Sequence, residues 1–369
     1  MHDASFDHLA DDLRFQGASC AMLGSPVWAE VLRRMADDVA ADGPTRDICA
    51  AHRDDRFGLA IPLRLLSGLH ELALTGASTR LAARLPSCTG TALDVSDGRV
   101  ADDLWTAVTA AFSDHADALA AALDADVQTN EVARSAGLAV GLAAIRSMTG
   151  LPLHLFEIGT SAGLNLRVDH FHLDPSTTIP GAATLGGATS PVVLAGLWDT
   201  DPGFGNVPMG DLQIERRAGC DPAPIDPTTD AGVARLRSFI WPDQTTRDER
   251  LRAAIAVARA HPAELRRAPA GTFVPAVLAE PHPGAVAVIQ HSIMWQYIDK
   301  EERPRIVEAI EAAGAAATPD APVAWVAYEP AAGQPHAAVT LRLWPQAPEP
   351  TVVAHADFHG RWVRPLVKT

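Results

Sequence analysis

The chain has 369 residues, of which 47% are hydrophobic and 20% are charged. This length and apolar content suit one large α/β domain or two domains of ordinary size, and they exclude a globally disordered chain. The 45 acidic and 30 basic side chains give a formal net charge of −15. A field of that sign disfavours nucleic acid and anionic membranes as partners. No window approaches about eighteen uncharged apolar residues, so no membrane span is predicted.

The cysteines and histidines give no sign of a disulfide framework or a metal centre. Four cysteines lie far apart, and the N-terminal residues are acidic, which predicts a reduced, cytoplasmic protein without a secretory signal. Two groups have spacing that metal ligands can adopt: Asp169, His170, His172 and Asp174, and His355, Asp357 and His359. Neither is a recognised ligand pattern, and alternation along a strand produces such spacing by chance, so no metal is predicted.

Residues 1–148 are predicted to form an all-helical domain. Ser25 and Pro26 are typical of a helix start, and apolar residues then recur every three to four positions until Gly43. Similar apolar stripes occur at 59–73, 101–112 and 131–146. Because this half contains no β-branched run between turn signals, we expect helices only.

Residues 149–369 are predicted to form an α/β domain. Short apolar runs are expected as strands at 153–158, 212–216, 286–291, 323–328, 339–344 and 352–358. Helical segments are expected between them at 230–240, 246–260, 272–280 and 300–313. This alternation predicts a mostly parallel sheet covered on both faces. The last two strands have no helix between them and should form an antiparallel edge hairpin, and the Pro-, Gly- and Thr-rich segment 174–210 is expected as a loop or insertion.

The first predicted strand ends in a glycine turn that fits two chemistries. Gly159-Thr160-Ser161-Ala162-Gly163 matches G-x-S-x-G, the nucleophile elbow of α/β-hydrolases. Together with Glu157 it also resembles the E-x-G-x-(G/S)-x-G motif of class I S-adenosylmethionine-dependent methyltransferases. There, glycines let the backbone approach the cofactor at the start of a helix, which is expected here from Leu164.

Three features favour the methyltransferase interpretation. A hydrolase needs earlier strands for its oxyanion hole, and none is predicted before residue 153. Glu157 would place a charge next to a nucleophilic Ser161. The turn Gly219-Cys220-Asp221 resembles the acidic turn that accepts hydrogen bonds from both ribose hydroxyls in these folds.

Several motifs are similar to those of a bacterial family catalogued as domain of unknown function 2332, over nearly the whole chain. They are Gln128–Arg134 (QTNEVAR), Glu157–Leu166 (EIGTSAGLNL), Arg217–Asp221 (RAGCD), Trp241–Gln244 (WPDQ) and Gln290–Ser292 (QHS). The resemblance implies a Rossmann-like class I methyltransferase fold preceded by a helical domain that covers its cleft. The chain departs from the family at His170-Phe171-His172, and it has Leu265–Ala270 (LRRAPA) where methyltransferases place an acidic residue for adenine.

The resemblance and the strand ends together predict a site for S-adenosylmethionine. The cofactor would be held by Glu157, Gly159, Ser161, Gly163, Asn165 and Asp221. The substrate would be held by Asn130, Arg134, Trp295 and Tyr297, although Asn130 and Glu131 are also an ordinary helix start. His291 or Glu131 would take the proton, since imidazole titrates near neutrality.

The predicted function is therefore methyl transfer to a small molecule, or binding of S-adenosylmethionine. Two alternatives stay open from the sequence. One is a serine hydrolase that uses Ser161, and the other is a non-catalytic ligand-binding protein that retains the fold.

Overall fold

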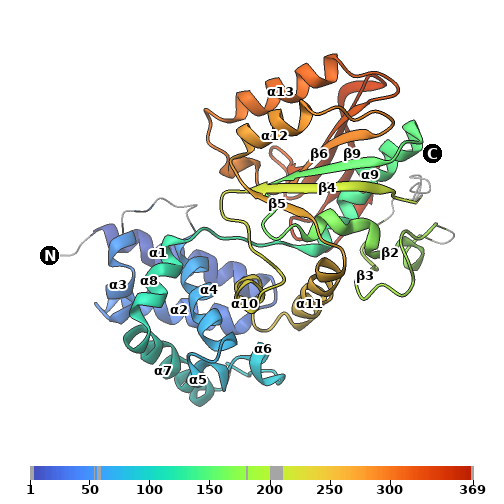
Figure 1. The fold of residues 1–369 in the computed structure, drawn as a ribbon. Helices are drawn as coiled ribbons and strands as arrows, with labels where there is room; N and C mark the ends of the chain where they lie inside the picture. Colours follow the sequence, from blue (N-terminus) through green and yellow to red (C-terminus); the bar gives the residue numbers. More distant parts are fainter. Residues whose placement is uncertain (1–3, 54, 56–59, 180–181, 200–210, 367–369) are drawn as a thin grey trace. The chain divides into compact units, whose positions relative to one another are not determined.

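The computed structural model describes residues 4–53, 55, 60–179, 182–199 and 211–366. The chain divides into two compact units (Figure 1). The helical unit comprises Met1–Thr129 and Thr229–Glu249, and the sheet unit comprises Asn130–Thr228 and Arg250–Thr369. Residues 130–148, which we expected in the helical domain, thus belong with the sheet. That the helical domain covers a cleft of the other stays a prediction.

The helical unit is built from amphipathic helices around one apolar core. Its longest helices are α1 (Ala4–Met22), α2 (Pro26–Ala40), α4 (Ile61–Leu74) and α7 (Gly98–Asp114). The shorter ones are α3 (Pro44–Ile48), η1 (Ala50–His52), α5 (Thr79–Ala82), α6 (Pro86–Thr89), α8 (Ala116–Asp124) and α10 (Asp230–Ser238). Trp28 and Leu69 are fully buried in this core. None of the helices described, in either unit, is long and apolar enough to cross a membrane.

Helix α2 is tied to its surroundings at its start and along its exposed face. The predicted cap Ser25 precedes Pro26, but its side chain does not cap the helix. Instead, Asp243 accepts hydrogen bonds from the Val27 backbone N–H (2.9 Å) and the Ser25 hydroxyl (2.8 Å). Asp243 therefore caps α2, to which it is not adjacent in sequence.

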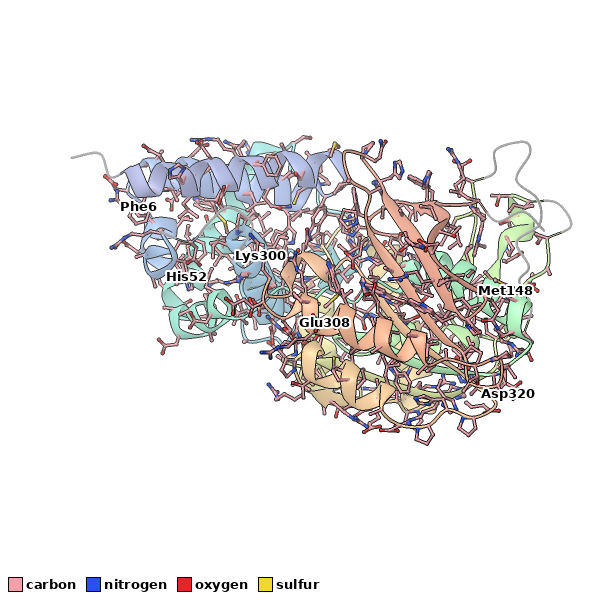
Figure 2. All side chains as sticks on the ribbon, turned by 90° about the horizontal axis from the view of Figure 1, so that it is seen from above. Phe6, His52, Met148, Lys300, Glu308 and Asp320 are labelled. Carbon is pink, nitrogen blue, oxygen red and sulfur yellow. The ribbon has the colours of Figure 1, made fainter. Side chains whose placement is uncertain are left out.

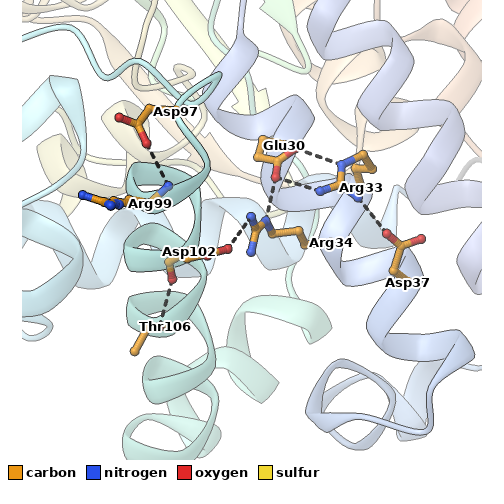
Figure 3. Close-up of polar contacts among 8 residues, drawn as sticks. All are labelled: Glu30, Arg33, Arg34, Asp37, Asp97, Arg99, Asp102 and Thr106. Atoms are coloured by element: carbon orange, nitrogen blue, oxygen red, sulfur yellow. Dashed lines mark hydrogen bonds and ion pairs between the residues drawn. The ribbon is translucent and has the colours of Figure 1, made fainter.

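Along the exposed face of α2, Arg34 joins two helices (Figure 3). Its guanidinium contacts Glu30 on the same helix (2.6 Å) and Asp102 on α7 (2.9 Å). Glu30 also pairs with Arg33, which extends to Asp37 (2.8 Å). Because Arg33, Asp37 and Asp102 are exposed, the pairs that they make contribute little stability each, whereas the Glu30–Arg34 pair is part-buried.

The sheet unit contains an eight-stranded sheet in the order β10-β9-β8-β7-β6-β1-β4-β5. The five strands β5, β4, β1, β6 and β7 run parallel to their neighbours in the sheet. The pairs β7–β8, β8–β9 and β9–β10 are antiparallel. This confirms the mostly parallel sheet with an antiparallel edge. The strands are β1 (Leu153–Ile158), β4 (Ile214–Asp221), β5 (Glu264–Arg267), β6 (Val286–Ser292), β7 (Val323–Pro330), β8 (Ala337–Trp344), β9 (Ala347–Ala356) and β10 (Val363–Pro365).

Helices cover both faces of the sheet (Figure 1). On one face, α12 (Ala270–Leu278) and α13 (Arg303–Ala315) form a core with Phe156, Ile289 and Trp325. On the other, α9 (Ser135–Thr149) lies so close to β7 that a Cβ at Gly137 would stand 2.8 Å from Tyr328. Helix α11 (Thr245–Ala260) spans the division between the two units.

The segments around the first strand differ from expectation in two ways. The α-helix predicted from Leu164 is the 3₁₀ helix η3 (Leu164–His170). The segment 174–210, predicted as a loop, holds the 3₁₀ helix η4 (Pro175–Thr177) and the short strand β3 (Val193–Ala195), which pairs in parallel with β2 (His172–Asp174) at the start of the segment. Residues 180–181 and 200–210 of that loop lie outside the described residues.

Replacing Asp243 with alanine should destabilise the helical unit by about 1–2 kcal/mol, because the Val27 N–H and the Ser25 hydroxyl lose their acceptor. Asp37→Ala is the matched control on α2, where an exposed pair should change stability by less than about 0.5 kcal/mol. Urea unfolding followed by circular dichroism measures both variants. Equal stabilities would contradict the capping role of Asp243.

Candidate functional site

The candidate site lies at the carboxyl ends of the parallel strands. The chain continues from β1 to β4 and β5 on one side, and to β6 and β7 on the other. The strand order therefore reverses between β1 and β6. In open α/β sheets, ligands bind outside the carboxyl ends of the strands at such a reversal. The candidate site is therefore expected among the residues that follow β1, β4, β6 and β7.

The two turns expected to act together do lie side by side. The Ser161 backbone N–H donates to Asp221 Oδ2 (3.0 Å), and Asp221 Oδ1 accepts from the Ala223 N–H (2.9 Å). The backbone also links the turns, since the Thr160 N–H donates to the Cys220 carbonyl (3.0 Å). These contacts arise because β1 and β4 pair in parallel, with Ile158 opposite Cys220.

The glycines of the first turn are packed against protein side chains. Gly159 and Gly163 have φ of +64° and +66°, which only glycine adopts readily. A Cβ at Gly159 would stand 2.8 Å from the Met294 side chain, and one at Gly163 would stand 2.7 Å from Leu265. Backbone conformation and close packing therefore explain both glycines without a ligand.

Glu157 is a buried carboxyl at the end of β1, only 3% exposed. Its oxygens accept from the Thr160 hydroxyl (2.7 Å) and the Gln290 amide (3.2 Å). Burial raises the pKa of Glu157 to about 7, against smaller lowering contributions from these two hydrogen bonds and from Arg167 and Arg134. The group is thus held within the sheet edge and titrates near neutral pH.

Three residues of the predicted binding sites make internal contacts instead. The Asn130 side chain accepts from the Leu164 N–H (3.0 Å), so it caps η3. Glu131 accepts from the Ala133 N–H (3.1 Å) and so caps η2 (Val132–Arg134), the 3₁₀ helix before α9. The Asn165 amide accepts from the Ser135 hydroxyl (2.7 Å). These bonds fix the glycine turn against the start of α9, and none of them reaches open space.

Arg134 is also directed inward. It is 7% exposed, and its guanidinium donates to the carbonyls of Phe358 (2.9 Å) and Ser292 (3.3 Å). It thus joins the segment after β9 to the end of β6. Two of its N–H groups are thus engaged by the protein backbone.

His291, predicted to take the proton, is buried at the end of β6. It is 1% exposed, and both of its ring nitrogens are occupied. Nδ1 contacts Glu329 Oε1 (2.7 Å), and Nε2 lies 3.0 Å from the Trp325 indole nitrogen. Both nitrogens are therefore engaged within the protein in this arrangement, and a role for His291 as proton acceptor stays a prediction. It is a buried histidine with both hydrogen-bonding positions satisfied.

The aromatic residues after β6 separate into two environments. Trp295 is half-buried and stacks on His291, with ring centroids 5.2 Å apart. Tyr297 is 71% exposed. Both belong to the short 3₁₀ helix η5 (Trp295–Tyr297). Of the two, Trp295 is therefore the one that belongs to the candidate site.

Three polar atoms at this edge are buried and have no hydrogen-bond partner in the described part of the chain. They are Ser161 Oγ, Gln290 Oε1 and Glu329 Oε2. Two backbone outliers lie beside them, since Ser161 and Ile293 both have φ of +51°. Strained residues and unsatisfied buried polar groups concentrate at functional sites.

Sequence reasoning missed Glu329 as a candidate. The available signal was its position, an acidic residue directly after the predicted strand 323–328, in line with the other strand ends. The described residues contain no group of three or more His, Cys, Asp or Glu side chains that could hold a metal ion.

The fold and this edge define a mixed α/β protein with a Rossmann-like sheet. Residues 10–364 match the model of a family described as an uncharacterized protein conserved in bacteria (DUF2332), so the chain belongs to this family. The family resemblance carried by the sequence motifs is thereby confirmed. No curated protein and no solved structure matches the chain.

Glu157→Gln should change how stability depends on pH. Because the folded-state pKa of Glu157 is about 7, raised by burial from 4.5, the folded protein keeps a proton that the unfolded chain has released. Stability should therefore fall as pH rises from 4.5 to about 7, and the variant should lack this loss. Relative to wild type, it should gain about 1–3 kcal/mol between pH 5 and pH 8. Urea unfolding at both pH values measures the difference, and the exposed Glu349→Gln is the control. Parallel curves for wild type and Glu157→Gln would contradict the titration.

Proposed function

We propose that the sheet unit binds S-adenosylmethionine at the carboxyl edge and transfers its methyl group to a small molecule. The observation that carries this proposal is the contact between the two turns, in which Asp221 accepts a hydrogen bond from the backbone of Ser161. In folds of this kind an acidic residue at the end of the second strand binds the ribose hydroxyls, and β4 supplies that residue here.

The polar atoms at this edge support a ligand rich in hydroxyl and amino groups. Asp221 is held in place by two backbone N–H groups. Ser161 Oγ and Gln290 Oε1 are buried without partners among the described residues. A bound ligand would satisfy atoms whose burial is otherwise unfavourable. The glycines would contribute backbone conformation rather than an open cradle, since Met294 and Leu265 fill the adjacent space.

When bound, S-adenosylmethionine would supply a methyl group that an acceptor's lone pair could displace from sulfur, with the electrons of the S–C bond remaining on sulfur. Such a displacement depends mainly on holding the two reactants in line. The acceptor's proton must go to a base, and His291 has no free nitrogen for it. Glu157, with a pKa of about 7, is the carboxyl at this edge that can take up a proton near neutral pH.

A serine hydrolase is the second candidate, favoured by one observation. Ser161 lies in a G-x-S-x-G turn after a strand, has a φ of +51°, and carries an unpartnered Oγ. Two observations oppose it. No described strand precedes β1, and no described histidine is hydrogen-bonded to Ser161 Oγ as a general base would be.

Titration calorimetry with S-adenosylmethionine and its demethylated product tests the proposed binding. Wild type should bind both in the micromolar to millimolar range, and Asp221→Asn should weaken binding by about tenfold or more through loss of a charged acceptor. Asp320→Asn is the matched control, an exposed carboxylate in the same unit that is labelled in Figure 2. No binding by wild type, or equal binding by Asp221→Asn, would reject the site. Binding without turnover on any acceptor would indicate the non-catalytic alternative.

A fluorophosphonate probe tests the hydrolase alternative. We expect no labelling of the wild-type protein, because Ser161 Oγ has no base beside it among the described residues. Mass spectrometry of the peptide that contains residue 161 is the measurement, and Ser161→Ala is the control for labelling elsewhere. Labelling that Ser161→Ala abolishes would establish the hydrolase and displace the methyltransferase proposal.

A further inference from the structure

The carboxylate of Glu329, at the end of β7, is bonded on one side only. Its Oε1 contacts His291 Nδ1 (2.7 Å) and accepts from the backbone N–H groups of Met294 (3.1 Å) and Trp295 (3.3 Å). Its Oε2 is buried and has no hydrogen-bond partner in the described part of the chain. The side chain is 17% exposed. One oxygen is thus saturated while the other is left without a donor.

The histidine beside Glu329 does not neutralise this carboxylate. The Trp325 indole N–H lies 3.0 Å from His291 Nε2, and an indole nitrogen can only donate. Nε2 must therefore be unprotonated, which leaves the single ring proton on Nδ1, facing Glu329. His291 is accordingly a neutral donor. Among the described residues it is the one ion-pair candidate within reach of Glu329, so the carboxylate has no compensating positive charge.

Two indole rings lie beside His291, which contacts this carboxylate. Trp295 stacks on His291 with a centroid separation of 5.2 Å, and Trp295 and Trp325 are 5.7 Å apart at an angle of 51°. The faces of indole rings carry partial negative charge and attract cations. Aromatic faces and a carboxylate oxygen without a donor both favour a cationic ligand.

The backbone is strained in a way that maintains this arrangement. Ile293 has a φ of +51°, which is a marked outlier for a β-branched residue, and its N–H donates to the Tyr328 carbonyl (2.8 Å). The bend at Ile293 directs the next two backbone N–H groups to Glu329 Oε1. Such strain persists only where the surrounding structure enforces it, and it is concentrated at ligand-binding positions.

We propose that Glu329, Trp295 and Trp325 form a binding site for an ammonium group. The ammonium would donate an N–H to Glu329 Oε2, supply the missing positive charge and lie against the indole faces. A hydroxyl would satisfy the hydrogen bond but not the charge, and an anion would be repelled. The side chain of Met294 packs against Gly159, so this site adjoins the glycine turn. The ammonium site itself does not depend on the proposed function. The inference that the methyl acceptor is an amine-bearing molecule rests on that function.

The test uses n-propylammonium as the probe and the indole ¹⁵N–¹H signals of the eight tryptophans as the readout. Saturable shifts are expected for few signals, including the one that disappears in Trp295→Leu. Glu329→Gln should weaken binding by about 10- to 100-fold, the factor expected for loss of a charged hydrogen bond. This variant keeps an acceptor for the three donors at Oε1 and places an amide N–H where the ligand would donate. Glu308→Gln, an exposed position on α13 labelled in Figure 2, should bind like wild type.

Three further probes test whether binding needs both the positive charge and the N–H donor of the ligand. Tetramethylammonium has the charge without an N–H, 1-propanol has neither charge nor N–H, and propionate has the opposite charge. Each should bind more weakly than n-propylammonium. If Glu329→Gln is unfolded by circular dichroism, Trp295→Leu should still weaken n-propylammonium severalfold through loss of one aromatic face. The proposal is overturned if n-propylammonium gives no saturable shift, if a folded Glu329→Gln binds it as wild type does, or if tetramethylammonium binds equally well.

Calorimetry of the wild-type protein with S-adenosylmethionine, alongside the n-propylammonium titration, separates this proposal from the proposed function. Ammonium binding in a wild-type protein that does not bind S-adenosylmethionine would reject the methyltransferase proposal and keep the ammonium site. The reverse result would reject the ammonium site alone.

Discussion

The parallel pairing of β1 with both β4 and β6 is the constraint on which the candidate site depends. In this register Glu157 lies opposite Gly219 on one side and Gln290 on the other. The strands therefore end at the same level of the sheet. The residues that follow them are close enough for backbone groups and short side chains to contact one another. A shift of one residue in either pairing would turn Glu157 or Gln290 to the opposite face. A shift in the pairing of β1 with β4 would also break the hydrogen bond from the Ser161 N–H to Asp221.

The edge formed in this way is energetically unfavourable as a purely structural element. It holds a carboxyl whose pKa is raised to about 7 by burial, and positive φ at Ser161 and Ile293. It also holds polar atoms of Ser161, Gln290 and Glu329 that have no partner among the described residues. Each feature costs on the order of 1–3 kcal/mol. In the helical unit, by contrast, the buried His70 has partners at both ring nitrogens, and burial lowers its pKa to about 4 so that it stays neutral. Single unpartnered atoms also occur elsewhere among the described residues, such as Trp28 Nε1 in the helical unit, so it is their combination with the raised pKa and the positive φ that favours a ligand at the sheet edge.

The sequence predicted most of the sheet because its strands are apolar runs flanked by turn residues. Leu153–Ile158 was predicted with its exact bounds, and Asp221 was expected beside the glycine turn. β5 was not predicted as a strand because its Glu264–Arg267 run (ELRR) is polar at the open edge of the sheet, where burial does not select apolar residues. The capping of α2 by Asp243 could not be predicted, since it joins residues 216 positions apart. For His291, the sequence could not show that both nitrogens would be occupied, because Trp325 and Glu329 come from another strand.

The alternation of side chains along β6 divides the polar groups of the edge between the two faces of the sheet. Gln290 pairs with Glu157 on the face covered by α9, while His291, one residue later, joins Glu329 and Trp325 on the face covered by α12 and α13. A ligand cannot pass through the sheet, so a molecule that contacts both clusters must lie across the ends of β1 and β6. Gly159, packed against Met294, is the point where the two clusters approach each other. A larger residue there would push Met294 away and disturb the backbone N–H groups that hold Glu329. The need for glycine at this position therefore comes from joining the two clusters, and it would apply with or without a nucleotide at the turn.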